Sequence, residues 1–223
     1  MRDKVCHSVA QALRDVMSGA SIYVGGFGGS GIPARLLRGL LDKEGVSDLT
    51  LINNNAGAGE ESFLGLVRAG RVSRIVCSYP RLPGSEVLRE QIVAGRLQVV
   101  VLPQGTLVEC IRAAGAGLGP FYTPTGFGTP LAQGKETRMY KGRGYVLEEP
   151  LAADFAFVRA SQADPAGNLV YRYAQRNFGP VMCMGAGTTI VEVERMVAPG
   201  ALAPDVIVTP GLFVDRIVQD GTA

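Results

Sequence analysis

The 223-residue sequence has little of several residue types on which enzymes and binding proteins often rely. It contains one histidine, His7, and no tryptophan, which excludes histidine-pair metal sites and most arrangements with a histidine as general base. Its four cysteines lie far apart and form no Cys-x-x-Cys pair, so we expect no structural zinc and no other bound metal. No apolar run approaches the roughly 20 residues that span a bilayer, and residues 1–15 lack the apolar segment of a secretion signal.

An excess of one charge sign is also missing. The sequence has 22 Lys+Arg against 20 Asp+Glu, a net charge of +2 spread along the chain. No basic run forms the surface that follows a phosphate backbone, so we expect no nucleic-acid partner. We also expect no membrane partner and a cytoplasmic location with reduced thiols. A chain of this length buries roughly 70% of its unfolded surface, so it needs neither a disulfide nor a metal for stability.

Glycine, in contrast, is abundant at 30 of 223 residues, nearly twice its usual share of about 7%. In the first half, short apolar runs alternate with segments of helical periodicity, beginning with a helical face over residues 5–16. The apolar runs cover residues 22–24, 49–52, 75–77 and 97–102. Strands that are apolar on both faces and alternate with helices are typical of parallel sheets. The pattern predicts an α/β fold over residues 1–115, an open, mostly parallel sheet with helices on both faces.

The second half has a different pattern. Residues 113–134 form a long segment rich in glycine, proline and threonine, and segments of this kind are often functional. Short strand-like pieces follow at residues 136–140, 145–147, 155–159, 169–171, 189–193 and 206–208. They predict a long loop and a strand-rich layer over residues 116–223, packed on the first half. Because no linker separates the halves, we expect one compact domain over residues 1–223.

Residues 26–31 match the Gly-x-Gly-x-x-Gly pattern, between a predicted strand and a predicted helix. A dinucleotide site also needs a carboxylate at the end of the second strand, but that strand ends in Asn53, Asn54 and Asn55. No Gly-Lys-Ser/Thr follows the glycines, so a Walker-type phosphate loop is excluded. A tight turn without a ligand remains open. The pattern favours a loop whose backbone approaches some other ligand.

Short segments spread over nearly the whole chain carry a resemblance to a known family. They read VGGFG at 24–28, GIP at 31–33, NNAG at 54–57, PQGTL at 103–107, IRA at 111–113, FYTPTG at 121–126, GKETR at 134–138, GNLVYR at 167–172, RNF at 176–178 and TPG at 209–211. In this order they resemble the A subunit of the family I CoA-transferases, two-subunit enzymes that move coenzyme A between carboxylic acids. Many segments in order are more specific than one glycine motif.

The resemblance implies a ping-pong reaction in which a glutamate on the other, B subunit of the enzyme attacks an acyl-CoA and becomes a glutamyl-CoA thioester. It implies that B subunit as partner in a hetero-oligomer, a coenzyme A thioester as substrate, no permanently bound cofactor and no catalytic residue in this chain. Neutral donors suit the negative oxygens of such a reaction. The resemblance places the candidate substrate- and oxyanion-binding residues at Gly25, Gly26, Phe27, Gly28, Gly31, Asn54, Asn55, Ala56, Gly57, Gln104, Gly105 and Thr106. An ordinary turn at Asn54–Asn55 and a helix start at Gln104 are the structural alternatives.

Two stretches are more similar to the 3-oxoadipate branch of the family than to the acetoacetate enzymes, residues 54–60 and residues 76–81. The resemblance therefore implies CoA transfer from succinyl-CoA to a 3-oxoacid, with 3-oxoadipate first and acetoacetate second. Arg81 is a candidate partner for the second carboxylate of 3-oxoadipate. A nucleotide-cofactor oxidoreductase, argued from the glycine motif, and a non-catalytic ligand-binding module are the alternatives from other classes.

Overall fold

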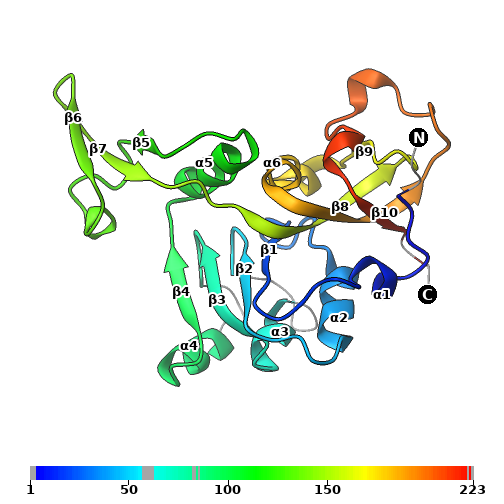
Figure 1. The fold of residues 1–223 in the computed structure, drawn as a ribbon, viewed down its shortest axis with the longest axis horizontal. Helices are drawn as coiled ribbons and strands as arrows, with labels where there is room; N and C mark the ends of the chain where they lie inside the picture. The colour runs from blue at the N-terminus through cyan, green and yellow to red at the C-terminus, as the bar shows by residue number, and fades with distance from the viewer. Residues whose placement is uncertain (1–3, 57–62, 82–83, 85, 220, 222–223) are drawn as a thin grey trace.

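The structure is a computed structural model that describes residues 4–56, 63–81, 84, 86–219 and 221. Its larger sheet has eight strands in the order β11-β10-β8-β1-β2-β3-β4, with β9 paired to β8, and its smaller sheet has three in the order β5-β7-β6 (Figure 1). The seven strands of the main path are parallel. The predicted α/β class with a mostly parallel sheet is confirmed.

The first half consists of the predicted strand–helix units. The strands are β1 (Ser21–Val24), β2 (Leu49–Ile52), β3 (Val72–Cys77) and β4 (Gln98–Val101). The helices are α1 (Val9–Ala12), α2 (Ala34–Asp42), α3 (Leu64–Arg68), α4 (Glu86–Val93) and α5 (Gln104–Gly115). One buried cluster joins residues of α1 to α4 to one face of the sheet. A second cluster joins α5 and α6 (Gly179–Gly185) to the other face, so helices cover both faces as predicted.

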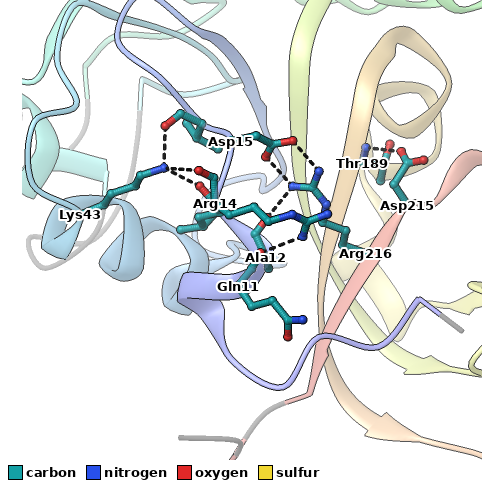
Figure 2. Close-up of polar contacts among 10 residues, drawn as sticks. Gln11, Ala12, Arg14, Asp15, Lys43, Thr189, Asp215 and Arg216 are labelled. Atoms are coloured by element: carbon teal, nitrogen blue, oxygen red, sulfur yellow. Dashed lines mark hydrogen bonds and ion pairs between the residues drawn. The ribbon is translucent and has the colours of Figure 1, made fainter.

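The first helix is shorter than the predicted helical face over residues 5–16. Only Val9–Ala12 is helical, and Val5 forms a parallel bridge to Ile217 instead. The Lys43 ammonium donates to the carbonyls of Leu13 (2.7 Å), Arg14 (3.1 Å) and Val16 (2.8 Å) (Figure 2). The last carbonyls of a helix lack helical partners, and here the ammonium satisfies them. The start of the helix is displaced because the N–H of Cys6 donates to the carbonyl of Ile217 at 2.8 Å. Ser8 then caps the helix by accepting the N–H of Gln11 at 3.1 Å.

The strands from residue 153 onward continue the main sheet and do not form a separate layer packed on it, which corrects that part of the prediction. They are β8 (Ala153–Ala163), β9 (Leu169–Val170), β10 (Ala186–Met196) and β11 (Arg216–Gln219). β8 pairs in parallel with β1 on one edge and with β10 on the other. It is buried on both faces for most of its length, which requires a position inside the sheet. The sheet thus crosses the predicted boundary near residue 115.

The predicted strand at residues 206–208 is wrong. The chain forms a short 3₁₀ helix there, η4 (Pro204–Val206), and Thr209 makes a single bridge to Leu169. Pro204 lacks a backbone N–H and has the φ of a first helical residue, so it starts a turn and not a strand. The other 3₁₀ helices are η2 (Pro130–Ala132), η3 (Tyr173–Arg176) and η5 (Gly211–Phe213).

The smaller antiparallel sheet contains β5 (Phe121–Thr123), β6 (Thr137–Tyr140) and β7 (Arg143–Glu148), and it extends away from the main sheet (Figure 1). The predicted loop over 113–134 is only partly a loop, because α5 continues to Gly115 and β5 lies within it. Phe127 from this segment covers Gly144 of β7, where an added Cβ would lie 2.1 Å from the ring. The loop thus supplies one layer of packing for the smaller sheet.

Candidate active site

The predicted site residues lie in the loops after two neighbouring parallel strands and at the start of the helix that follows another strand of the same sheet. The glycine loop, residues 25–31, follows β1. Asn53, Asn54 and Asn55 follow β2, and Gln104 begins α5 just after β4. Carboxyl ends of parallel strands meet at one edge, where such sheets bind ligands. The strand order also reverses at this point of the sheet, because the chain adds β2, β3 and β4 on one side of β1 and β8 on the other.

Three side-chain amides form a continuous chain across this edge. Gln104 Nε2 donates to Asn54 Oδ1 at 2.9 Å, and Asn54 Nδ2 donates to Asn55 Oδ1 at 2.9 Å. The backbone N–H of Gly28 also donates to Asn55 Oδ1 at 2.9 Å, which connects the amides to the glycine loop. We call Gln104, Asn54 and Asn55 the amide chain. It brings the predicted asparagine pair, glutamine and glycine loop together in one hydrogen-bonded unit.

Asn53 is buried and has a structural role in this unit. Its Nδ2 donates to the carbonyl of Val24 at 2.5 Å, and its Oδ1 accepts the backbone N–H of Asn55 at 2.8 Å. It ties the end of β1 to the turn after β2. The turn continues through Ala56, which is buried with a φ of 54°. Gly57, another predicted site residue, lies outside the described residues.

The glycine loop folds back tightly on itself. The backbone N–H of Phe27 and the carbonyl of Ser30 lie 3.0 Å apart, and the Ser30 N–H returns to the Phe27 carbonyl at 3.0 Å. Gly26, Gly28 and Gly31 have positive φ, and at Gly31 a Cβ would lie 2.6 Å from the carbonyl oxygen of Gln175. Glycine is required there both by conformation and by space.

Two residues that follow β9 hold the other side of the glycine loop. Asn177 Oδ1 accepts the N–H of Gly26 at 3.2 Å, and Asn177 has an unusual φ of 25°. The ring of Phe178 meets the ring of Phe27 edge to face, with 6.3 Å between centroids. Phe27 is nevertheless 45% exposed, so an aromatic surface is presented at the mouth of the site. Neither residue was among the predicted site residues, although the RNF segment was part of the resemblance.

A buried carboxylate stabilises the start of the helix after the glycine loop. Pro33 precedes α2 and provides no side-chain cap. The fully buried Glu192 of β10 accepts the backbone N–H of Arg35 at 2.8 Å and of Leu36 at 3.3 Å. Its other oxygen pairs with Arg159 at 3.1 Å. A carboxylate suits a helix N-terminus because unpaired N–H groups and the helix dipole meet there.

The N-terminus of α5 is open on the side of the site. Pro103 precedes the helix without a side-chain cap, and the first helical hydrogen bond runs from Leu107 to the Pro103 carbonyl. Gln104 and Gly105 are exposed, and nothing lies within 4 Å of an added Cβ on Gly105. Thr106 is buried, and its hydroxyl has no hydrogen-bond partner among the described residues. Backbone N–H groups at such a position favour an anion.

The site contains neutral donors rather than an activated nucleophile. Burial raises the pKa of the Cys77 thiol, at the end of β3, to about 11, so it stays protonated near neutral pH. The cavity beneath the glycine loop has a volume of about 10 Å³, too small for an acyl group. This cavity is therefore not a substrate pocket.

Among the residues that the structure describes, no three His, Cys, Asp or Glu side chains gather as metal ligands would. The same residues contain no helix with the length and apolar character needed to cross a membrane. A dinucleotide site needs a carboxylate at the end of the second strand. Here the amides of Asn53 and Asn55 occupy that position beside the glycine loop, which argues against such a site.

Residues 6–220 match the family model described as Coenzyme A transferase. The chain belongs to this family. Membership of the CoA-transferase family confirms the resemblance and argues against the nucleotide-cofactor oxidoreductase. It identifies the chain as part of a CoA-transferase enzyme. It does not by itself assign roles to the individual site residues, which stay predictions.

Two relatives and one solved structure illustrate the match. The chain is 50% identical over 218 residues to the A subunit of the 3-oxoadipate CoA-transferase of Pseudomonas putida, covering 98% of this chain and 94% of the relative. It is 42% identical over 216 residues to the A subunit of the probable succinyl-CoA:3-ketoacid coenzyme A transferase of Bacillus subtilis, covering 96% and 89%. An acyl-CoA transferase of Escherichia coli O157:H7, solved as a thioester complex with CoA, has the same fold with a TM-score of 0.85 and 22% identity. This chain is covered completely and spans about half of that longer chain, 49% of its length.

Proposed function

We propose that this chain is the A subunit of a two-subunit CoA-transferase that moves coenzyme A from succinyl-CoA to a 3-oxoacid. The observation that carries the proposal is the amide chain at the open N-terminus of α5, next to the glycine loop, in a site whose buried thiol is inert. Such a site offers donors to a developing anion but leaves the nucleophile to another chain. The proposal includes the B subunit as partner, a single domain over residues 1–223, a cytoplasmic location and no permanently bound cofactor.

The reaction proceeds through anhydride and thioester exchanges. A glutamate carboxylate of the partner subunit first attacks the carbonyl carbon of succinyl-CoA, and the CoA thiolate leaves to give a glutamyl–succinyl anhydride. The thiolate then attacks the glutamyl carbonyl, which releases succinate and forms the glutamyl-CoA thioester. The incoming 3-oxoacid carboxylate reverses these two steps and leaves with coenzyme A. Each attack places negative charge on one oxygen of a tetrahedral carbon.

The residues of this chain act on these charges without forming covalent bonds. Gln104 keeps one N–H on Asn54 and has a second N–H that no described residue accepts. That N–H and the first backbone N–H groups of α5, which no described residue accepts, are donors for a substrate carboxylate or oxyanion. Phe27 supplies an apolar wall and limits access of water. Preorganised donors lower the barrier because they need no reorientation when charge develops.

We propose 3-oxoadipate as the acceptor, which the name of the relative at 50% identity supports, and Arg81 as the partner of its second carboxylate. Acetoacetate is the second candidate, supported by names that specify a 3-ketoacid without further detail. The acceptor is decided by one assay. The chain is produced together with its partner subunit, and succinyl-CoA is supplied with either acid.

We expect the thioester of 3-oxoadipate to form faster than that of acetoacetate, with CoA esters quantified by chromatography. Arg81→Ala should reduce the rate with 3-oxoadipate and leave the rate with acetoacetate unchanged. A stable complex that transfers CoA to no oxoacid contradicts the proposed function. Saturable quenching or enhancement of NAD(P)H fluorescence would instead return the oxidoreductase to consideration.

A further inference from the structure

Ser78 directly follows β3 and was not among the predicted site residues. Its backbone N–H donates to the carbonyl of Asn54 at 2.9 Å, and the N–H of Tyr79 reaches the same carbonyl at 3.1 Å. The Ser78 hydroxyl lies 2.9 Å from that carbonyl oxygen and 2.8 Å from Asn54 Oδ1. A carbonyl oxygen has two lone pairs, and both are used by backbone N–H groups. The hydroxyl proton is therefore directed to Asn54 Oδ1.

The direction of the amide chain follows from a group that cannot be reversed. The backbone N–H of Gly28 only donates, so the atom of Asn55 that faces it is the oxygen. That oxygen also faces Asn54, which must therefore present its NH₂ group there and its oxygen on the far side. The oxygen of Asn54 meets Gln104, which must present its NH₂. Each amide orientation is determined by the one before it.

Ser78 adds a second hydrogen bond that holds the middle of this chain in the same orientation. Asn54 is only 2% exposed, so no solvent replaces a lost partner. Its Oδ1 accepts from both Ser78 and Gln104, and a reversed amide would set its NH₂ against the NH₂ of Gln104. With Oδ1 held by Ser78, Gln104 is held with its NH₂ inward and its second N–H free.

We propose that Ser78 is a positioning residue for CoA transfer, whose hydroxyl holds the Asn54 amide and thereby orients Gln104 toward the substrate. The proposal rests on the proposed function. Ser78 acts through Asn54 and does not touch the reacting atoms. Its loss changes how well Gln104 is aligned when negative charge develops, so it lowers kcat more than it raises KM.

The test uses the complete complex with the partner subunit, succinyl-CoA and the better 3-oxoacid. Ser78→Ala should lower kcat about tenfold, because the lost hydrogen bond aligns Gln104 with the charge that develops in the transition state. It should change KM for succinyl-CoA by less than about twofold. Ser78→Thr keeps the hydroxyl and should restore most of kcat. The matched control is Ser21→Ala at the opposite end of β1, because Ser21 is also half-buried and its hydroxyl donates to a side-chain oxygen, Asp154 Oδ2 at 2.7 Å. Ser21→Ala should leave kcat unchanged.

A double-mutant cycle separates positioning from a general loss of stability. In a Gln104→Ala background, Ser78→Ala should cost less than about twofold in kcat, because the group that it positions is gone. An equal cost in both backgrounds overturns the proposal, and so does an active complex in which Ser78→Ala behaves as wild type. If Ser78→Ala does not fold, Ser78→Cys, with a weaker donor of similar size, should give a kcat between those of wild type and Gln104→Ala. A wild-type complex without transferase activity overturns the proposed function itself, which is a different result.

Discussion

Two groups of polar residues hold the glycine loop and the helix after it, and they differ in charge. On the β2 and β3 side, the neutral amide chain reaches Gly28, and Gln104 at its outer end is exposed. On the β8 and β10 side, the carboxylate of Glu192 is fully buried and divides its oxygens between the start of α2 and Arg159. The charged side stabilises the start of α2. The neutral side has exposed donors, which the proposed function assigns to an anion, so the proposal separates structural support from substrate binding.

The largest expected effect on stability is at the charged side. Glu192→Ala removes a buried carboxylate, leaves Arg159 without this partner and leaves the first N–H groups of α2 uncapped. Breaking a buried pair in this way costs about 3–5 kcal/mol of unfolding free energy. Glu194→Ala is the matched control, because Glu194 contacts the same arginine at 3.4 Å but is 40% exposed, and about 1 kcal/mol is expected. Urea unfolding of both variants measures the difference in unfolding free energy; equal losses would show that burial does not account for the contribution of Glu192.

The neutral side should show the opposite behaviour, with a loss of activity and little loss of stability. Gln104→Ala removes one preorganised donor, and in the complex with the partner subunit we expect kcat to fall about 10²–10³-fold. Gln98→Ala at the start of β4 is the control, since Gln98 is exposed at the opposite end of that strand. Steady-state kinetics and thermal unfolding are measured on the same preparations. A Gln104→Ala variant with full kcat contradicts a role for the amide chain in transfer.

The glycine loop between the two sides offers a comparison within a few residues. Gly31→Ala introduces a Cβ 2.6 Å from the Gln175 carbonyl at a φ of 76°, so about 2–4 kcal/mol should be lost from strain and overlap. Gly28→Ala has a φ of 60° but nothing within 4 Å, so only conformational strain of about 1 kcal/mol is expected. Equilibrium unfolding of the two variants checks this. If Gly28→Ala is the more destabilised, the loop is not seated against Gln175 as described.

The ion pair of Arg216 with the half-exposed Asp15 should contribute least, and it tests whether burial explains the contribution of Glu192. Arg216 holds both oxygens of Asp15 at 2.6 and 2.5 Å (Figure 2). This bidentate hydrogen bond lowers the pKa of Asp15 below its usual value of 3.8. A carboxyl group whose pKa is lowered by folding stabilises the fold above the unfolded pKa, and that stability is lost as pH falls through the folded pKa.

Asp15→Asn should therefore cost about 0.2–1 kcal/mol at pH 6, since the Asp15 side chain is 47% exposed. The difference in unfolding free energy between wild type and variant should narrow below pH 4 and vanish once Asp15 is protonated in the folded protein. Urea unfolding over a pH series measures it. A gap that stays constant down to pH 2 would show that charge is not its source.

The sequence predicted the parts of the fold that depend on local patterns. Apolar runs at residues 22–24 and 49–52 are β1 and β2, and the class and the helices on both faces follow from them. It did not predict that β8 pairs with β1, because the local pattern around residue 22 or residue 155 does not indicate which distant strand each will pair with. It extended the first helix because the pairing of Val5 and Cys6 with Ile217, which is distant in sequence, has no local signal.

The site could be predicted where residues follow strands and where the resemblance named them. Asn54, Asn55 and Gln104 meet because β2 and β4 end at the same edge, a consequence of parallel order. Ser78 had an available signal, since it too follows a strand of that edge. Glu192 had none, because its buried carboxylate is explained only by the helix start that it meets across the fold.

The proposed function assigns the donors to this chain and the nucleophile to the partner subunit. Incubating the complex with succinyl-CoA, without an acceptor acid, and determining the masses of both chains by mass spectrometry tests this assignment. We expect a mass increase on the partner subunit equal to one CoA thioester, with the mass of this chain unchanged. A CoA adduct on this chain, or full transfer activity with no adduct on either chain, would contradict it.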